Sequence, residues 1–154
     1  MSTASPLVVW SAGIDALLFA AIGLLHVYWS LGGTWGADVA LPTRGGRPSD
    51  PPKFTFHPTP LGTFIVALLL FAAAVVVLGQ VGVIGDPTQP PHTVFLAGTW
   101  VLAALFLLRA IGEFRYVGFF KRVRDTEFAK WDTQLFSPLC LGIAVLAAIA
   151  ALGG

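Results

Sequence analysis

Residues 60–84, PLGTFIVALLLFAAAVVVLGQVGVI, decide the fold class, because this stretch has no charged side chain over 25 consecutive positions. A helix of about 20 apolar residues crosses the ~30 Å hydrocarbon core of a bilayer. Comparable apolar runs cover about residues 7–31, 93–112 and 134–152. We therefore predict an all-α, polytopic membrane protein, built as a bundle of four transmembrane helices.

The composition agrees with this class, since 56% of the residues are hydrophobic and only 11% are charged. Soluble domains have about 25% charged residues. Four spans and their loops use the whole length of 154 residues, so we expect a single integral membrane domain over residues 1–154. The single cysteine, Cys140, excludes a disulfide within the chain.

The basic residues are distributed on one side of this arrangement. The tails and the turn between the second and third spans have no Lys or Arg, and all nine lie in the two other loops or at the end of the third span. The positive-inside rule then predicts a plasma-membrane protein with loops one and three cytoplasmic and both termini outside. These residues are Arg44, Arg47, Lys53, Arg109, Arg115, Lys121, Arg122, Arg124 and Lys130.

The two polar loops, loop one before the second span and loop three at about residues 113–133, have different patterns. Loop one, residues 34–59, is rich in Pro and Gly, which favours an irregular cap over the helix ends. Aromatic and basic residues between Tyr116 and Trp131 recur near helical spacing, which predicts an amphipathic interfacial helix; a solvated loop with aromatic anchors is the alternative. Ser137 and Pro138 are typical of a helix N-cap and first turn, but a span starting there is short, so we expect the last helix to begin about one turn earlier.

Asp15 and His26 are the first candidates for chemistry. They are eleven residues apart in the first span, and about 100° of rotation per residue puts both on one helix face, roughly 16 Å apart. An acid inside a span must face protein, water or a bound group. We predict a water-accessible pocket with His26 at its mouth and Asp15 deeper. The structural alternative is that Asp15 hydrogen-bonds Thr99 or Gln80 and holds the bundle together.

Arg109 and Glu113 lie at positions i and i+4 at the end of the third span. A salt bridge within the helix is the simplest interpretation. In the functional alternative, Arg109 binds an anionic head group, and Glu113 acts with His26 as a general acid or base. The predicted catalytic residues are thus Asp15, His26 and Glu113.

Aromatic side chains are dense at the predicted cytoplasmic end of the spans, where His26 and Arg109 also lie. An interfacial aromatic belt accounts for most of them, whereas a binding site would use aromatic faces to stabilise a cationic group. The predicted substrate-binding residues are Tyr28, Trp29, Trp35, Arg109, Phe114, Arg115, Trp131 and Asp132.

Several classes of function are not indicated. The His and carboxylate residues lack metal-ligand spacing, no glycine-rich loop follows a strand, and no serine stands in a nucleophile elbow. We therefore expect no metal, no other cofactor and no nucleic-acid partner.

Three stretches together carry a family resemblance: HVYWSLGGTWG at residues 26–36, RAIGEFRYVGFFK at 109–121 and TEFAKWDTQLFSPLC at 126–140. They resemble a family of small bacterial integral membrane proteins catalogued only as a domain of unknown function. The resemblance covers nearly the whole chain and implies four membrane helices, but it implies no activity. All three stretches fall at the predicted cytoplasmic end, which makes that end the expected site.

Three functions are compatible with these features. The first is a membrane-embedded enzyme that performs proton-initiated isomerase or cyclase chemistry, without a cofactor, on an isoprenoid or other lipid-like substrate. The second is a small proton-coupled exporter that works as a homo-oligomer with Asp15 at the shared interface. The third is a non-catalytic accessory protein whose cap binds a partner.

Overall fold

The computed structural model describes residues 5–44, 53–54, 58–84 and 92–153. Within these residues, four helices are long and apolar enough to cross a membrane. The fourth of them is continuous from α5 through the π-helical turn η1 into α6. The prediction of an all-α membrane protein with four spans is therefore confirmed. The bounds are α1 Pro6–Ser30, α3 Pro60–Gln80, α4 His92–Ile111, α5 Glu127–Trp131, η1 Asp132–Phe136 and α6 Ser137–Gly153.

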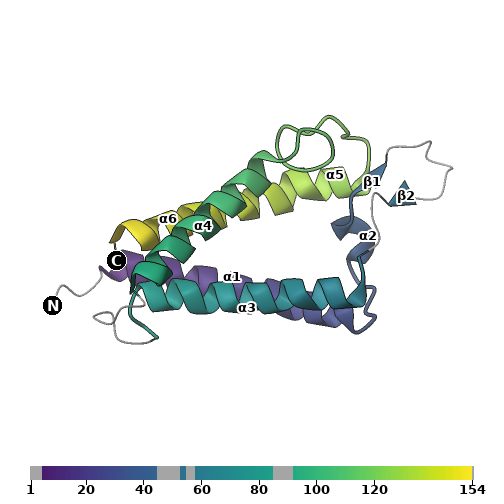
Figure 1. The fold of residues 1–154 in the computed structure, drawn as a ribbon. Helices are drawn as coiled ribbons and strands as arrows, with labels where there is room; N and C mark the ends of the chain where they lie inside the picture. Colours follow the sequence, from purple (N-terminus) through teal and green to yellow (C-terminus); the bar gives the residue numbers. More distant parts are fainter. Residues whose placement is uncertain (1–4, 45–52, 55–57, 85–91, 154) are drawn as a thin grey trace.

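The four spans are arranged as two pairs. Helix α1 packs along α3, and α4 packs along α6. The pairs come together at the end that holds both termini and diverge towards the opposite end, where the short helix α2, Ala37–Ala40, lies between them (Figure 1). We call these the terminal end and the loop end of the bundle.

Small residues allow the helices to approach closely. Ala12 on α1 and Ala147 and Ala150 on α6 are fully buried. The ring of Phe71 packs directly against Gly23, where a Cβ atom would come within 2.9 Å of it. Small residues are typical of contacts between membrane helices, because van der Waals packing replaces the hydrophobic driving force there.

Large apolar side chains cover the outside of the bundle. Leu17 is 72% exposed, Leu69 64% and Leu108 63%, on three different spans. Such a continuous apolar exterior would be unfavourable in water, and it matches the hydrocarbon core of a bilayer. The outside of the bundle is therefore a lipid-facing surface.

The two polar loops meet at the loop end, because α2 contacts α5. In loop one, β1, Thr43–Arg44, pairs antiparallel with β2, Lys53–Phe54. Loop three differs from the prediction of an amphipathic helix, which is wrong for residues 112–126: this segment is irregular. The helix begins only at Glu127, where the Thr126 hydroxyl caps it by accepting from the Ala129 N–H at 3.1 Å.

The last helix begins before Ser137, as expected, but it does so by ten residues and not by about one turn. Ser137 lies inside a continuous helix that began ten residues earlier, at Glu127, and it makes no N-cap. Its side chain donates to the carboxylate of Asp132 instead. The true N-cap, Thr126, is also a hydroxyl residue, and unlike Ser137 it is followed by an acidic residue, Glu127.

Candidate functional site

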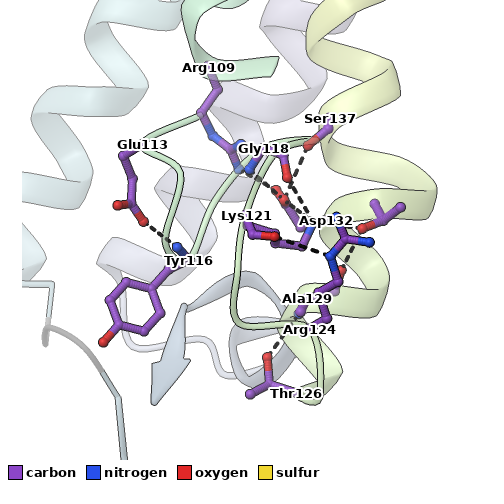
Figure 2. Close-up of polar contacts among 11 residues, drawn as sticks. Arg109, Glu113, Tyr116, Gly118, Lys121, Arg124, Thr126, Ala129, Asp132 and Ser137 are labelled. Carbon is purple, nitrogen blue, oxygen red and sulfur yellow. Dashed lines mark hydrogen bonds and ion pairs between the residues drawn. The ribbon is translucent and has the colours of Figure 1, made fainter. Parts of the chain in front are cut away.

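An ion cluster centred on Asp132 joins three segments at the loop end (Figure 2). One carboxylate oxygen of Asp132 accepts from Arg109 Nη2 of α4 at 2.9 Å. The other accepts from the Gly118 N–H at 2.8 Å, Lys121 Nζ at 2.9 Å and Ser137 Oγ at 3.2 Å. Four donors thus surround a carboxylate that is itself fully buried.

Lys121 is the buried counter-ion of this cluster. Its side chain is 1% exposed, and its ammonium has three hydrogen atoms to donate. All three have acceptors: Asp132 Oδ2, the Gly118 carbonyl at 3.0 Å and Thr133 Oγ1 at 2.6 Å. A buried charge is tolerated when it is paired and hydrogen-bonded in this way.

The loop of residues 112–118 brings Lys121 back to the end of α4. Gly112 and Gly118 lie against each other, each with a φ of +88°, and a Cβ atom on Gly118 would collide with the Ile111 carbonyl oxygen. The Phe119 N–H then donates a hydrogen bond to the Ala110 carbonyl oxygen at 2.9 Å. Only glycine fits this crossing, because any side chain would collide with backbone.

The π-helical turn η1 sets the direction of the Asp132 side chain. A π-turn inserts one extra residue into a helix and rotates the residues around it, and such turns are frequent at functional sites. Here it allows Asp132 and Ser137, five residues apart, to share one hydrogen bond. The cluster therefore fixes α4, loop three and the last span to one another.

The predicted salt bridge between Arg109 and Glu113 is wrong. The helix ends at Ile111, so the i and i+4 positions no longer lie one above the other. Glu113 instead accepts a hydrogen bond from the Tyr116 N–H within its own loop, while Arg109 pairs with Asp132 (Figure 2).

A cavity of about 480 Å³ lies elsewhere at the loop end, between α1, α2 and α3. Its lining is mostly apolar or small, with Ala37, Ala40 and Leu41 from the α2 region and Val66 from α3. His26 and Trp29 contribute from the last turns of α1. The volume lies within the ~300–1,000 Å³ of small-molecule sites.

His26 is held in one tautomer by its own helix. Its Nδ1 lies 2.8 Å from the Ile22 carbonyl oxygen. A carbonyl only accepts, so Nδ1 carries the proton, and Nε2 of the neutral ring is the basic nitrogen. Within the part of the chain that the structure describes, Nε2 makes no hydrogen bond. The ring also makes an edge contact with Trp29, with 5.1 Å between centroids.

Three of the predicted aromatic residues are connected at the end of α1, and of these three Trp29 lines the cavity. Trp29 Nε1 donates to the Trp35 carbonyl at 2.9 Å, and the Trp35 N–H donates to the Tyr28 hydroxyl at 3.3 Å. The Tyr28 ring lies against Gly33, another residue of the cavity lining. The chain after α1 is thus folded back over the helix end, where it closes one side of the cavity.

Other predicted binding residues lie on the outside of loop three. Phe114 and Trp131 are 57% and 43% exposed. Arg115 stacks over the Tyr116 ring at 5.2 Å. These contacts fit interfacial anchors, and none of the three residues lines the cavity.

The predicted catalytic residues are not brought together. His26 lines the cavity, whereas Glu113 is bonded within loop three and Asp15 is fully buried between the helices. Asp15 makes no hydrogen bond to Thr99 or Gln80, and both of its carboxylate oxygens are without a partner among the described residues. The expected structural role of Asp15 through those two bonds is therefore wrong.

Sequence reasoning missed Lys121, Thr133 and Gly118, which complete the Asp132 cluster. The spacing of Gly112 and Gly118 at the end of a span was an available signal of a closed loop. No sequence signal marks the π-turn, so the direction of Asp132 could not be derived. Among the described residues no group of three or more His, Cys, Asp or Glu side chains could hold a metal ion.

The fold and the loop-end contacts define a small four-helix membrane protein. A family model described as "Protein of unknown function (DUF3995)" matches residues 19–147, more than four-fifths of the chain. The chain therefore belongs to this family, as the resemblance of its three motifs predicted. Comparison with curated proteins and with solved structures gives no match.

Proposed function

We propose that this protein binds an amphiphilic, lipid-like molecule in the loop-end cavity and that His26 transfers protons to and from it. The observation that carries the proposal is the juxtaposition of a cavity of about 480 Å³ with a histidine whose tautomer is fixed. A general base needs a nitrogen without a proton near its substrate, and in the neutral ring of His26 that nitrogen is Nε2.

The lining supports a ligand with one polar end. Thr59 caps the N-terminus of α3 by accepting from the Gly62 N–H at 3.1 Å, and both residues line the cavity. The positive end of a helix dipole favours an anionic or electron-rich group. Val66 and Leu41 offer apolar contacts. The ligand that fits is a lipid-like molecule, such as an isoprenoid, whose head lies between His26 and the start of α3.

The chemistry that a single histidine supports here is a proton shift. His26 Nε2 would remove a proton from one carbon and return it to another, so that the product is an isomer and no cofactor is consumed. Cyclase chemistry would draw further on Trp29, whose ring lines the cavity and could stabilise a cationic carbon. Isomerisation is therefore our first proposal and cyclisation the second.

The exporter alternative has less support. It requires Asp15 on a surface shared between subunits, and the Asp15 side chain is 0% exposed within one chain. An accessory role would rest on the exposed aromatic residues of loop three, which an interfacial belt already explains.

We also propose a plasma-membrane orientation in which the loop end is cytoplasmic and both termini are outside. Both termini lie at the terminal end (Figure 1). The nine Lys and Arg residues belong to loops one and three or to the end of α4. The positive-inside rule connects the two observations.

The test compares small molecules that copurify with wild type and with His26→Gln from the same mild detergent. Gln keeps the polar group and the approximate length but has no basic nitrogen. We expect wild type to convert the retained lipid-like molecule, and His26→Gln to hold it unchanged. Glu113→Gln, outside the cavity, is the matched control and should behave as wild type. Unaltered conversion by His26→Gln would contradict the acid–base role.

A further inference from the structure

A second group of buried polar side chains lies between the helices, away from the cavity. Asp15 and Thr99 are 0% exposed, Gln80 1% and Ser11 2%. We call these four residues the polar layer. They come from α1, α3 and α4. Neither carboxylate oxygen of Asp15, and neither side-chain polar atom of Gln80, has a hydrogen-bond partner among the described residues.

The register of α1 against α3 brings Asp15 and Gln80 to the same level. Gly23 contacts Phe71 across this antiparallel pair. Asp15 precedes Gly23 by eight residues, and Gly79 follows Phe71 by eight. At ~1.5 Å per residue, Asp15 and Gly79 therefore lie about 12 Å along their helices from the Gly23–Phe71 contact, in the same direction. Gln80 is the next residue. Both side chains are buried, so both face the inside of the bundle at this level.

Two hydroxyl residues, Thr99 on α4 and Ser11 on α1, complete the polar layer. Phe19 packs on Phe106, with 5.3 Å between ring centroids. Asp15 is one turn before Phe19, and Thr99 is two turns before Phe106, so both residues lie on the faces that meet there. Ser11 is one turn before Asp15 on the same face of α1.

The polar layer is rich in acceptors and poor in donors. The Ser11 hydroxyl donates to the Leu7 carbonyl at 2.8 Å, and the Thr99 hydroxyl donates to the Phe95 carbonyl at 2.8 Å. Both hydroxyl hydrogens are therefore used, and only oxygen lone pairs remain. With the two Asp15 oxygens and Gln80 Oε1, the polar layer holds five oxygens that can accept and one NH₂ group that can donate.

The charge of this layer is also unbalanced. An ionised carboxylate inside a membrane bundle costs several kcal/mol without a partner. Among the described residues no Lys, Arg or His is ion-paired or hydrogen-bonded with Asp15. The chain's Lys and Arg residues belong to the loops of the opposite end or to the end of α4. The balancing charge is therefore a single positive charge, either a proton on Asp15 or a bound monovalent cation.

We propose that the polar layer is a binding site for one sodium ion. Oxygen ligands suit a hard cation, and a single carboxylate suits a single positive charge. The ligands would be Asp15, Gln80 Oε1 and the hydroxyl oxygens of Ser11 and Thr99. The site is independent of the loop-end cavity, so it stands even if the proposed function fails. It lies close to the terminal end, since Gln80 is the last residue of α3.

The first experiment measures the melting temperature of the full chain in mild detergent, with sodium chloride replacing choline chloride at constant ionic strength. A ligand that binds only the folded state at a hundred times its Kd should raise Tm by about 5–10 °C in a protein of this size. Asp15→Asn should abolish the rise, and Ser11→Ala should increase the half-saturating sodium concentration roughly tenfold. Asp38→Asn, an exposed acid on α2, is the matched control and should respond as wild type.

The second experiment uses wild type alone, so it does not depend on the folding of a variant. Infrared difference spectra between sodium and choline solutions report the carboxylic-acid band of a protonated Asp. We expect sodium to remove such a band, because it displaces the proton from Asp15. An equal Tm response to both salts, or a band that persists at saturating sodium, would overturn the proposal and leave Asp15 as a permanently protonated group.

Discussion

Replacing Asp132 by Asn should strongly destabilise the protein. The substitution keeps the shape of the side chain but removes the charge that pairs with Lys121 at 2.9 Å, and Lys121 is 1% exposed. Breaking a buried ion pair by removing one partner costs about 3–5 kcal/mol, since the remaining charge stays buried. At about 2–4 °C for each kcal/mol in a chain of this size, Tm should fall by roughly 6–20 °C.

Tryptophan fluorescence during heating in detergent would measure this change. Glu127→Gln is the control, because it breaks the Lys130–Glu127 pair, in which both side chains are more than half exposed, and should cost at most about 1 kcal/mol. The double variant Lys121→Met, Asp132→Leu should lose less stability than Asp132→Asn, because no fully buried charge is left alone; Arg109, which loses the same partner, has a side chain that is 35% exposed. Equal melting temperatures for Asp132→Asn and Glu127→Gln would refute the reasoning.

Two further predictions concern loop three and the orientation. Gly118→Ala should destabilise the protein by at least about 3 kcal/mol, because the new Cβ would meet the Ile111 carbonyl oxygen. Gly13→Ala is the control and should be neutral or stabilising, because a Cβ at Gly13 has nothing within 4 Å. Thermal melting of both variants measures the difference. In intact cells that carry Cys140→Ser, a membrane-impermeant maleimide should label Leu152→Cys at the terminal end and not Asp125→Cys in loop three; the reverse pattern would invert the proposed orientation.

The sequence predicted the spans well because their signal is local. An apolar run reports directly on a transmembrane helix, and residues 60–80 form α3 as expected from the run at 60–84. The prediction for loop three failed because aromatic residues at helical spacing serve equally well as anchors on an irregular chain. There the turn at Gly112 and Gly118, and not the spacing, sets the path.

The site was predicted only in part, because its contacts join residues distant in the sequence. Arg109 and Asp132 were both expected to bind, but 23 positions separate them, and nothing local indicates that they pair. His26 and Trp29 lie on one short stretch, and the structure brings both to the cavity. Asp15 was identified as a candidate because an ionised carboxylate inside a membrane span is energetically costly. Its surroundings could be known only from the packing of the four helices.

The most direct test of the central proposal is native mass spectrometry of wild type beside Ala37→Trp. Ala37 lines the cavity, and an indole at this position would fill much of its volume of about 480 Å³. Val101→Trp, on the exposed side of α4, is the matched control. We predict that wild type and Val101→Trp each retain one lipid-like molecule per chain and that Ala37→Trp retains none. Equal retention by all three proteins would contradict a binding site in this cavity.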